Sequence, residues 1–339
     1  MKKSLFMGAL LALGMAATTL SASTLEEVKA RGILNCGTST GVAGFSLPDA
    51  NNVYQGFDVA VCRAVAAAVL GDPMAVEFVP TTGKTRFTAL ASGEVDVLSR
   101  TTTWTFSRDV DLKLDFHGVN YYDGQGFMVP KSLGVTSAKD LDGATVCIQV
   151  GTTTELNLAD FFRVNGITYE PVPTEKSSES RSLYQAEACD VYTTDASGLA
   201  SARSTFADPD AHVILPEIVS KEPLGPVTRH GDNQWGDIVR WTLNALISAE
   251  ELGITKANVA EMAAAPTNNP EINRMMGTEG NLGEMLGLDA DWAVRVIAAE
   301  GNYGEIFESN IGSGTIIGLD RGHNAQWTDG GLIYSPPFR

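Results

Sequence analysis

The chain has 339 residues, with 24 Lys and Arg against 41 Asp and Glu and a formal net charge of -17 at pH 7. This charge argues against nucleic acid and anionic membrane surfaces as partners, because both repel an acidic protein. The length is enough for two lobes of ordinary domain size, and any site for an anion must rest on local arginines.

The N-terminus has the pattern of a cleaved secretory signal. Two lysines precede an apolar run from Leu5 to Ala17, and small residues follow at Ser21 to Ser23. The run is shorter than the ~20 apolar residues of a membrane span, and no later segment comes close. We therefore expect residues 1–23 to be a signal peptide and the mature protein to be periplasmic and not membrane-anchored.

Helix and strand patterns then alternate. Residues 24–32 predict a short helix that ends at Gly32, and residues 33–39 predict a buried strand. Apolar residues recur at helical spacing from Phe57 to Ala68, and a strand, a helix and a strand follow over residues 74–99. Repeated β-α-β units predict a parallel sheet with helices on both faces.

A second run of the same kind begins near residue 139. A strand at 144–150 leads through a glycine-threonine loop into a helix at 151–166, and residues 167–173 are extended. Residues 180–204 again predict a helix, a strand and a helix. The two halves therefore repeat one architecture.

Two segments rich in Gly and Pro, 121–132 and 221–232, are candidate crossings between the halves. We expect one lobe from residues 24–126 and 227–339, wrapped by the C-terminal segment. The second lobe, with the hinge crossings, takes residues 127–226. Two crossings make a hinge with a cleft between the lobes.

The cysteine count suggests two disulfides, because an even number in an exported chain is typically paired. We expect Cys36 to pair with Cys62 and Cys147 with Cys189, since each pair is close in sequence and falls within one lobe. Buried free thiols are the alternative. There is no C-x-x-C and the four histidines lack ligand spacing, so no metal site is expected.

Ligands of open parallel sheets bind at the carboxyl ends of the strands, so four loops carry the candidate site. The first follows residue 36 and holds Val42 and Phe45, which are candidates for a lid over a small ligand. The alternative for Phe45 is an ordinary core position, where aromatic side chains are more common.

The second loop, TTTWTFSRD, begins at Thr101. In an extended chain Thr101, Thr103 and Thr105 point to one side, and Arg108 falls in the first turn of the next helix. The planar fork of an arginine matches a carboxylate. The alternative is a structural salt bridge from Arg108 to a neighbouring aspartate.

The third and fourth loops complete the set. Thr152 and Thr153 follow Gly151 at a helix start, where they either contact a ligand or only cap the helix. The loop lacks the lysine of a P-loop. Asp195 ends the strand of the fourth loop and is suited to an ammonium group, with helix capping as the alternative. Together the loops complement a zwitterionic α-amino acid.

These segments resemble the periplasmic amino-acid-binding proteins of ABC importers, solute-binding protein family 3. The resemblance spans nearly the whole mature chain and rests on GFDVAVCRAVA, ALASGEVDVLS, TTTWTFSRD, VGTTTE and CDVYTTD. It implies an α/β, periplasmic-binding-protein-like fold of two parallel-sheet lobes joined by a two-strand hinge. It also implies that Thr103 and Arg108 hold the ligand carboxylate, while Thr153 and Asp195 contact the carboxylate and ammonium from the other lobe.

Several segments, among them NYYDGQGFMV and the ending NAQWTDGGLIYSPPFR, are similar to a subgroup that binds L-amino acids generally or glutamate, glutamine, aspartate and asparagine. The resemblance places Arg86 at the side-chain carboxylate, with a surface arginine as the alternative. Ser39 and Ser177 stand where acidic binders often carry Arg and His, so the amides join the acids as expected ligands. Thr101 replaces a usual Gly or Ser, which leaves less room beside the ligand.

We therefore expect a monomeric binding protein without a cofactor, which closes on a polar or acidic L-amino acid and presents the closed form to an inner-membrane ABC permease. The alternative is a cleft enzyme of the same fold, dehydratase-like, acting on a carboxylated substrate. Such an enzyme needs a general acid or base, for which only Glu155 or Asp195 is placed, since no histidine falls in the four loops.

Overall fold

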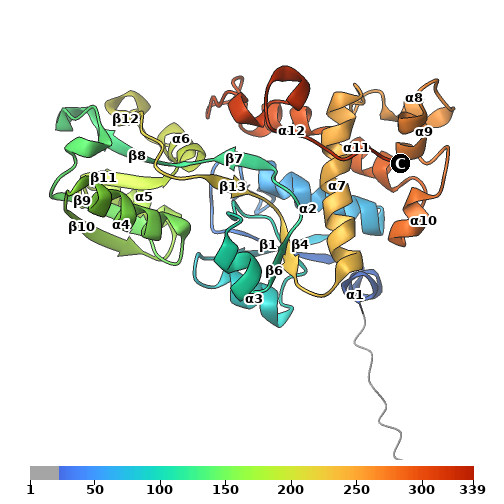
Figure 1. Ribbon diagram of the computed structural model, residues 1–339, viewed down its shortest axis with the longest axis horizontal. Helices are drawn as coiled ribbons and strands as arrows, with labels where there is room; N and C mark the ends of the chain where they lie inside the picture. The colour runs from blue at the N-terminus through green and yellow to red at the C-terminus, as the bar shows by residue number, and fades with distance from the viewer. Residues whose placement is uncertain (1–22) are drawn as a thin grey trace, which may run out of the picture.

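The computed structural model describes residues 23–339 of the chain. The expected signal peptide, apart from its last residue, lies outside the described part. Figure 1 shows two lobes side by side along the long axis of the molecule, each built on its own five-stranded sheet. None of the described helices is both long enough and apolar enough to cross a membrane.

The sheet of the first lobe has the strand order β4-β1-β5-β14-β6. Its strands are β1 (Leu34–Ser39), β4 (Val76–Thr81), β5 (Val97–Leu98), β6 (Leu114–Phe116) and β14 (Val227–Arg229). β1 runs parallel to β4 and β5, whereas β14 runs antiparallel to β5 and β6. The sheet is therefore mixed and not purely parallel, because β14 enters it from the opposite end, on the return from the other lobe.

The helices of this lobe follow its strands. They are α1 (Thr24–Arg31), α2 (Phe57–Leu70), α3 (Arg86–Ser92) and the long α7 (Asn233–Glu251), and a small hairpin is formed by β2 (Leu47–Pro48) and β3 (Tyr54–Gln55). α2 is buried along most of its length and packs against α7. The lobe thus places the ends of β1 and β5 at the edge that faces the second lobe.

The sheet of the second lobe has the order β10-β9-β11-β8-β12. Its strands are β8 (Gln125–Pro130), β9 (Ala144–Gln149), β10 (Tyr169–Thr174), β11 (Val191–Asp195) and β12 (His212–Ile214). β9 is parallel to both β10 and β11, while β8 is antiparallel to β11 and β12. This sheet is also mixed, because β8 is the strand that brings the chain in from the first lobe.

Three helices of the second lobe start at loops that follow its strands. They are α4 (Thr153–Asn165), α5 (Ser177–Gln185) and α6 (Ala196–Ser204). Because α4 follows β9, α5 follows β10 and α6 follows β11, their first turns lie at the carboxyl ends of the parallel strands. These first turns meet the first lobe.

The two crossings between the lobes pair with each other. β7 (Tyr121–Asp123) and β13 (Glu222–Leu224) form a two-stranded antiparallel ladder in which Glu222 lies opposite Asp123 (Figure 1). Both strands fall in the segments rich in Gly and Pro that the sequence marks as crossings. The exact lobe boundaries at residues 126 and 226 remain a prediction.

The C-terminal segment packs on the first lobe. Its helices are α8 (Val259–Ala264), α9 (Pro270–Met275), α10 (Leu282–Leu286), α11 (Trp292–Glu300) and α12 (Tyr303–Asn310), shown in orange and red in Figure 1. α11 packs against α2 and α7, and Arg321 binds Glu250 of α7 with both terminal nitrogens, at 2.9 and 3.1 Å. This segment is therefore part of the core of the first lobe.

Both disulfides join the expected partners. Cys36 of β1 is bonded to Cys62 of α2, and Cys147 of β9 is bonded to Cys189 just before β11. Each bond ties a strand of one sheet to a neighbouring element of the same lobe. Neither disulfide crosses the hinge, so both leave the lobes free to move relative to each other.

Candidate ligand-binding cleft

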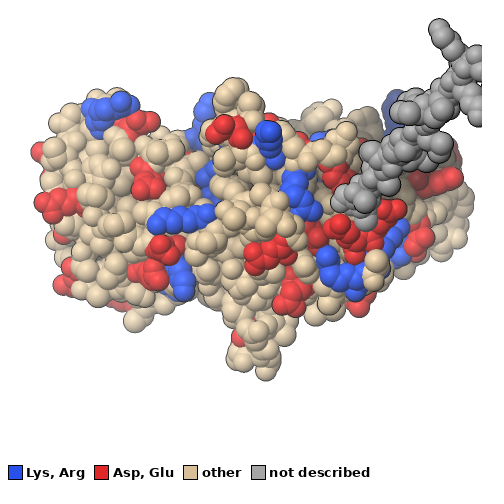
Figure 2. All heavy atoms as spheres, turned by 90° about the horizontal axis from the view of Figure 1, so that it is seen from below, with Lys and Arg blue, Asp and Glu red and all other residues tan. Residues whose placement is uncertain are grey.

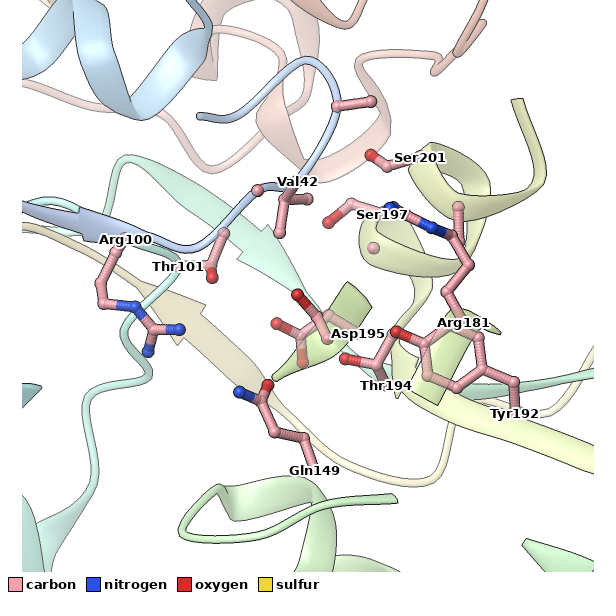
Figure 3. Close-up of a pocket in the computed structure, with 15 residues that line it drawn as sticks. Val42, Arg100, Thr101, Gln149, Arg181, Tyr192, Thr194, Asp195, Ser197 and Ser201 are labelled. Atoms are coloured by element: carbon pink, nitrogen blue, oxygen red, sulfur yellow. The ribbon is translucent and has the colours of Figure 1, made fainter. Parts of the chain in front are cut away.

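A recess lies between the lobes and is lined from both sides (Figure 3). The first lobe contributes residues 41–43 together with Arg100 and Thr101 at the end of β5. The second lobe contributes Gln149, Asp195 and the first turns of α5 and α6. The recess therefore stands at the carboxyl ends of the strands, where the sequence places the candidate site.

Arg108 is held in the wall of the first lobe. It lies in a five-residue π-helical turn, Ser107–Asp111, and not at the start of the α-helix that the sequence predicts. Its side chain is buried, and Nη1 donates a hydrogen bond of 2.8 Å to the carbonyl oxygen of Thr103. The described residues give it no ion pair with Asp109 or Asp111, so the salt-bridge alternative is wrong.

Arg86 and Arg100 are buried beside Arg108. Arg86 begins α3 and is 3% exposed, so it is not a surface arginine, and its guanidinium lies 4.6 Å from the ring centre of Phe87. Arg100 follows β5 and is 6% exposed. Neither guanidinium makes a hydrogen bond or ion pair with any residue of the described chain, and both Nε atoms are buried without a partner.

The three arginines perturb one another. Burial lowers the pKa of Arg86 well below its usual value, and the charges of Arg100 and Arg108 lower it further. Burial also lowers the pKa of Arg100 and that of Arg108 to about 10. These two arginines remain protonated at neutral pH, and a buried charge without a partner costs several kcal/mol. Such a cluster is suited to an anion that enters from outside.

Asp195 supplies the opposite charge. It ends β11, immediately before α6, but its carboxylate does not cap that helix, so the capping alternative is wrong. Its pKa is raised well above the usual range by burial first and then by the charges of Asp123 and Glu222, while Arg86 and Arg108 oppose the shift. A ligand ammonium group would stabilise the charged form of this carboxylate.

Two acidic residues of the hinge were missed by the sequence analysis. Glu222 is 1% exposed and accepts hydrogen bonds from Thr153 Oγ1 at 3.0 Å, Asn157 Nδ2 at 2.7 Å and Ser220 Oγ at 2.7 Å. Asp123, opposite it, accepts from the hydroxyl of Ser197 in α6, and burial raises its pKa to about 6. The hinge therefore binds the starts of two helices that line the cleft.

The sequence predicts that the threonines of the second loop point to one side of the chain. In the structure they do not. Thr101 has a left-handed backbone, with φ of 46°, and its N–H donates a 2.9 Å hydrogen bond to Asp58 Oδ2. Thr105 accepts a hydrogen bond from the backbone N–H of Arg108 at 3.3 Å. Thr101 lines the recess, and Thr103 is buried with its hydroxyl 3.4 Å from that of Thr153 across the cleft.

The remaining candidates lie near the recess in structural roles. Thr152 caps α4, since its hydroxyl accepts from Glu155 N at 3.4 Å and donates to Gln149 O at 2.7 Å. Phe45 is 1% exposed and packs edge-to-face on Tyr121, while Val42 lines the recess. Contact of Phe45 or Thr152 with a ligand remains a prediction.

The face of the molecule drawn in Figure 2 has no single basic area. On the face drawn in Figure 2, basic side chains occur singly or in small groups among acidic ones. Among the described residues no group of three His, Cys, Asp or Glu is placed to hold a metal ion. The buried positive charge of the candidate site is on Arg100 and Arg108.

The lobes touch across the cleft. Lys84 Nζ of the first lobe lies 3.2 Å from Glu175 Oε1 of the second. Gly83 approaches so closely that a Cβ on it would lie 2.7 Å from the carbonyl oxygen of Val150 and 3.1 Å from the methyl group of Thr152. The residue at this contact has to be small for the cleft to close.

Gly83→Ala should hinder closure. Overpacking of a close contact costs about 1–3 kcal/mol, so we expect ligand affinity, measured by isothermal titration, to fall roughly 10-fold or more. The melting temperature of the ligand-free protein should stay the same, because the clash exists only between lobes. Gly314→Ala, where an added Cβ meets nothing within 4 Å, is the control. Wild-type affinity in the Gly83 variant would contradict the closure argument.

Comparison with known proteins agrees with this architecture. The chain is 66% identical to the glutamate/glutamine/aspartate/asparagine-binding protein of Rhodobacter capsulatus, over all of both chains. It is 57% identical to the general L-amino acid-binding periplasmic protein of Rhizobium johnstonii, over 96% of each. A solved periplasmic binding protein from Brucella ovis, with glutathione bound, matches with a TM-score of 0.91 and 56% identity, over 94% of this chain and 100% of that one.

The family model for bacterial extracellular solute-binding proteins, family 3, matches residues 34–258. The relatives are binding proteins and not enzymes, so the enzyme alternative is not supported. The chain belongs to the bacterial extracellular solute-binding proteins, family 3.

Proposed function

We propose that the protein is the periplasmic substrate-binding component of an ABC amino-acid importer and binds glutamate, glutamine, aspartate and asparagine. The observation that carries this proposal is Arg100, a buried arginine without a counter-ion that lines a recess between the lobes together with Asp195, while Arg86 and Arg108 act on Asp195 through their charges. The name of the Rhodobacter capsulatus relative gives the same four ligands, and the name of the Rhizobium johnstonii relative supports L-amino acids in general.

In this proposal each end of the α-amino acid has its own partner. The α-carboxylate binds Arg108, whose orientation is fixed by the carbonyl of Thr103, and the hydroxyl of Thr103 donates to the same group. The hydroxyl of Thr153 joins it when its proton turns from Glu222 to the ligand. The α-ammonium binds Asp195. Arg86 takes part in binding the oxygens of the side chain. Each charge-assisted hydrogen bond contributes about 1.5–3 kcal/mol.

Binding is coupled to closure because the partners come from different lobes. Arg108 belongs to the first lobe and Asp195 to the second, so a ligand that bridges them favours the closed form over the open one. The closed protein then presents both lobes to an inner-membrane ABC permease in the periplasm. We further propose that it does so as a monomer.

Asp195→Asn should abolish the ion pair with the ligand ammonium. Loss of one partner from a buried charge pair costs about 2–5 kcal/mol, so affinity for glutamate and glutamine should fall roughly 30-fold or more in isothermal titration of refolded, ligand-free protein. Asp160→Asn removes the same charge from an exposed pair with Arg163 and should change nothing. Equal binding by the two variants would contradict the proposed role of Asp195.

A second candidate ligand is a γ-glutamyl peptide. The relative from Brucella ovis was solved with glutathione bound, whose γ-glutamyl end carries the same α-carboxylate and α-ammonium as glutamate. Ser177 and Arg181 of α5 also line the recess, and Figure 3 shows Arg181 on the side of Asp195 away from Arg100. Arg181 makes no ion pair or side-chain hydrogen bond with the described residues, so its guanidinium is free to meet the distal carboxylate of a longer ligand.

This candidate predicts that glutathione and glutamate compete for one site. Arg181→Gln should weaken glutathione roughly 10-fold and leave glutamate unchanged, because the proposal places the charged groups of glutamate on other residues. Titration with glutathione in the presence and absence of saturating glutamate measures both effects. Failure of glutathione to bind at millimolar concentration would remove this candidate and leave amino-acid binding standing.

A further inference from the structure

Arg100 is a buried charge in the wall of the recess. It is 6% exposed and stands beside Thr101 at the end of β5, facing Gln149 and Asp195 of the other lobe. Figure 3 shows its guanidinium on the side of Asp195 opposite to Arg181. No residue of the described chain accepts a hydrogen bond from this guanidinium, and its Nε is fully enclosed.

One acidic residue of its own lobe acts on Arg100 through its charge but is engaged elsewhere. Asp58, in the first turn of α2, accepts hydrogen bonds from Thr101 N at 2.9 Å and Ser99 Oγ at 3.5 Å. It makes no ion pair with Arg100 within 4 Å. Burial raises the pKa of Asp58 to about 7, so it is a weak counter-ion. Its structural task is to hold the left-handed turn at Thr101, next to Arg100.

The proposed function assigns the α-carboxylate to another arginine, so Arg100 is available to bind a different group of the ligand. Arg108 is anchored by the carbonyl of Thr103 and serves the α-carboxylate in the proposed function. Arg100 instead lines the recess together with residues 41–43 and Asp195. A guanidinium kept dry and unpaired at that point matches a second oxygen-bearing group.

We propose that Arg100 is a specificity-determining residue, which donates hydrogen bonds to the side-chain oxygens of the ligand and favours a carboxylate over an amide. This inference rests on the proposed amino-acid binding. In the ligand-free protein the unpaired buried charge of Arg100 is destabilising, and a bound ligand that pairs with it relieves this destabilisation. Arg86 is also buried and unpaired, and the charge of Arg100 acts on it.

Arg100→Met tests the inference, because loss of a ligand contact and loss of a structural contact change the melting temperature and the ligand affinity in different ways. We expect the melting temperature of the ligand-free variant to stay unchanged or rise, since an unpaired buried charge is replaced by an apolar side chain of similar length. Affinity for glutamate should fall roughly 30-fold or more, and affinity for glutamine less than about 5-fold. Arg100→Lys, which keeps the charge, should retain part of the preference for glutamate.

Arg163→Met is the matched control. It removes one positive charge from an exposed pair on α4 and should alter neither the melting temperature nor either affinity. A lower melting temperature of Arg100→Met with equal losses for both ligands would assign Arg100 a structural role and overturn the inference. Unchanged binding of both ligands would also overturn it. If the wild-type protein bound none of the four amino acids, the proposed function itself would fail.

Discussion

The candidate binding site depends on buried arginine side chains that have no counter-ion within the protein. Arg86, Arg100 and Arg108 are buried together, and only Arg108 has a hydrogen-bond partner for its guanidinium. Buried charges are normally paired, because desolvation is expensive. Here Asp195, whose pKa is raised well above its usual range by burial, faces the arginines across the recess and makes no ion pair with any of them. A zwitterionic ligand can pair its carboxylate with the arginines and its ammonium group with Asp195 at the same time. One small molecule can therefore hold the two lobes together.

The hinge is part of the same electrostatic arrangement. Glu222 and Asp123 lie opposite each other on the crossing strands, and each binds the start of a helix that lines the cleft, Glu222 at α4 and Asp123 at α6. The charge of Glu222 acts on Arg108 and Asp195. The hinge and the ligand site are therefore electrostatically linked. The disulfides, each confined to one lobe, stiffen the lobes without restraining the hinge.

Much of this arrangement can be predicted from the sequence. The alternation of helix and strand patterns locates the elements, and the rule that ligands bind at strand ends brings Arg108 and Asp195 to one cleft. The sequence could not show that β8 and β14 run antiparallel to their neighbours, because strand direction depends on how the crossings enter each sheet. Arg100 was missed since an arginine at a strand end looks solvent-exposed until the other lobe covers it. Glu222 was missed because a single acid in a segment rich in Pro and Gly gives no sign of burial.

The most direct test of the account is a crystal structure of the protein with glutamate bound. The account predicts the α-carboxylate at Arg108 and Thr103, the ammonium at Asp195, and the side-chain carboxylate on the wall formed by Arg100 and Arg86. Ligand density at those groups would show that the buried charges exist for the ligand. Glutamate bound elsewhere, with the three guanidiniums still unpaired or satisfied by protein groups alone, would contradict it.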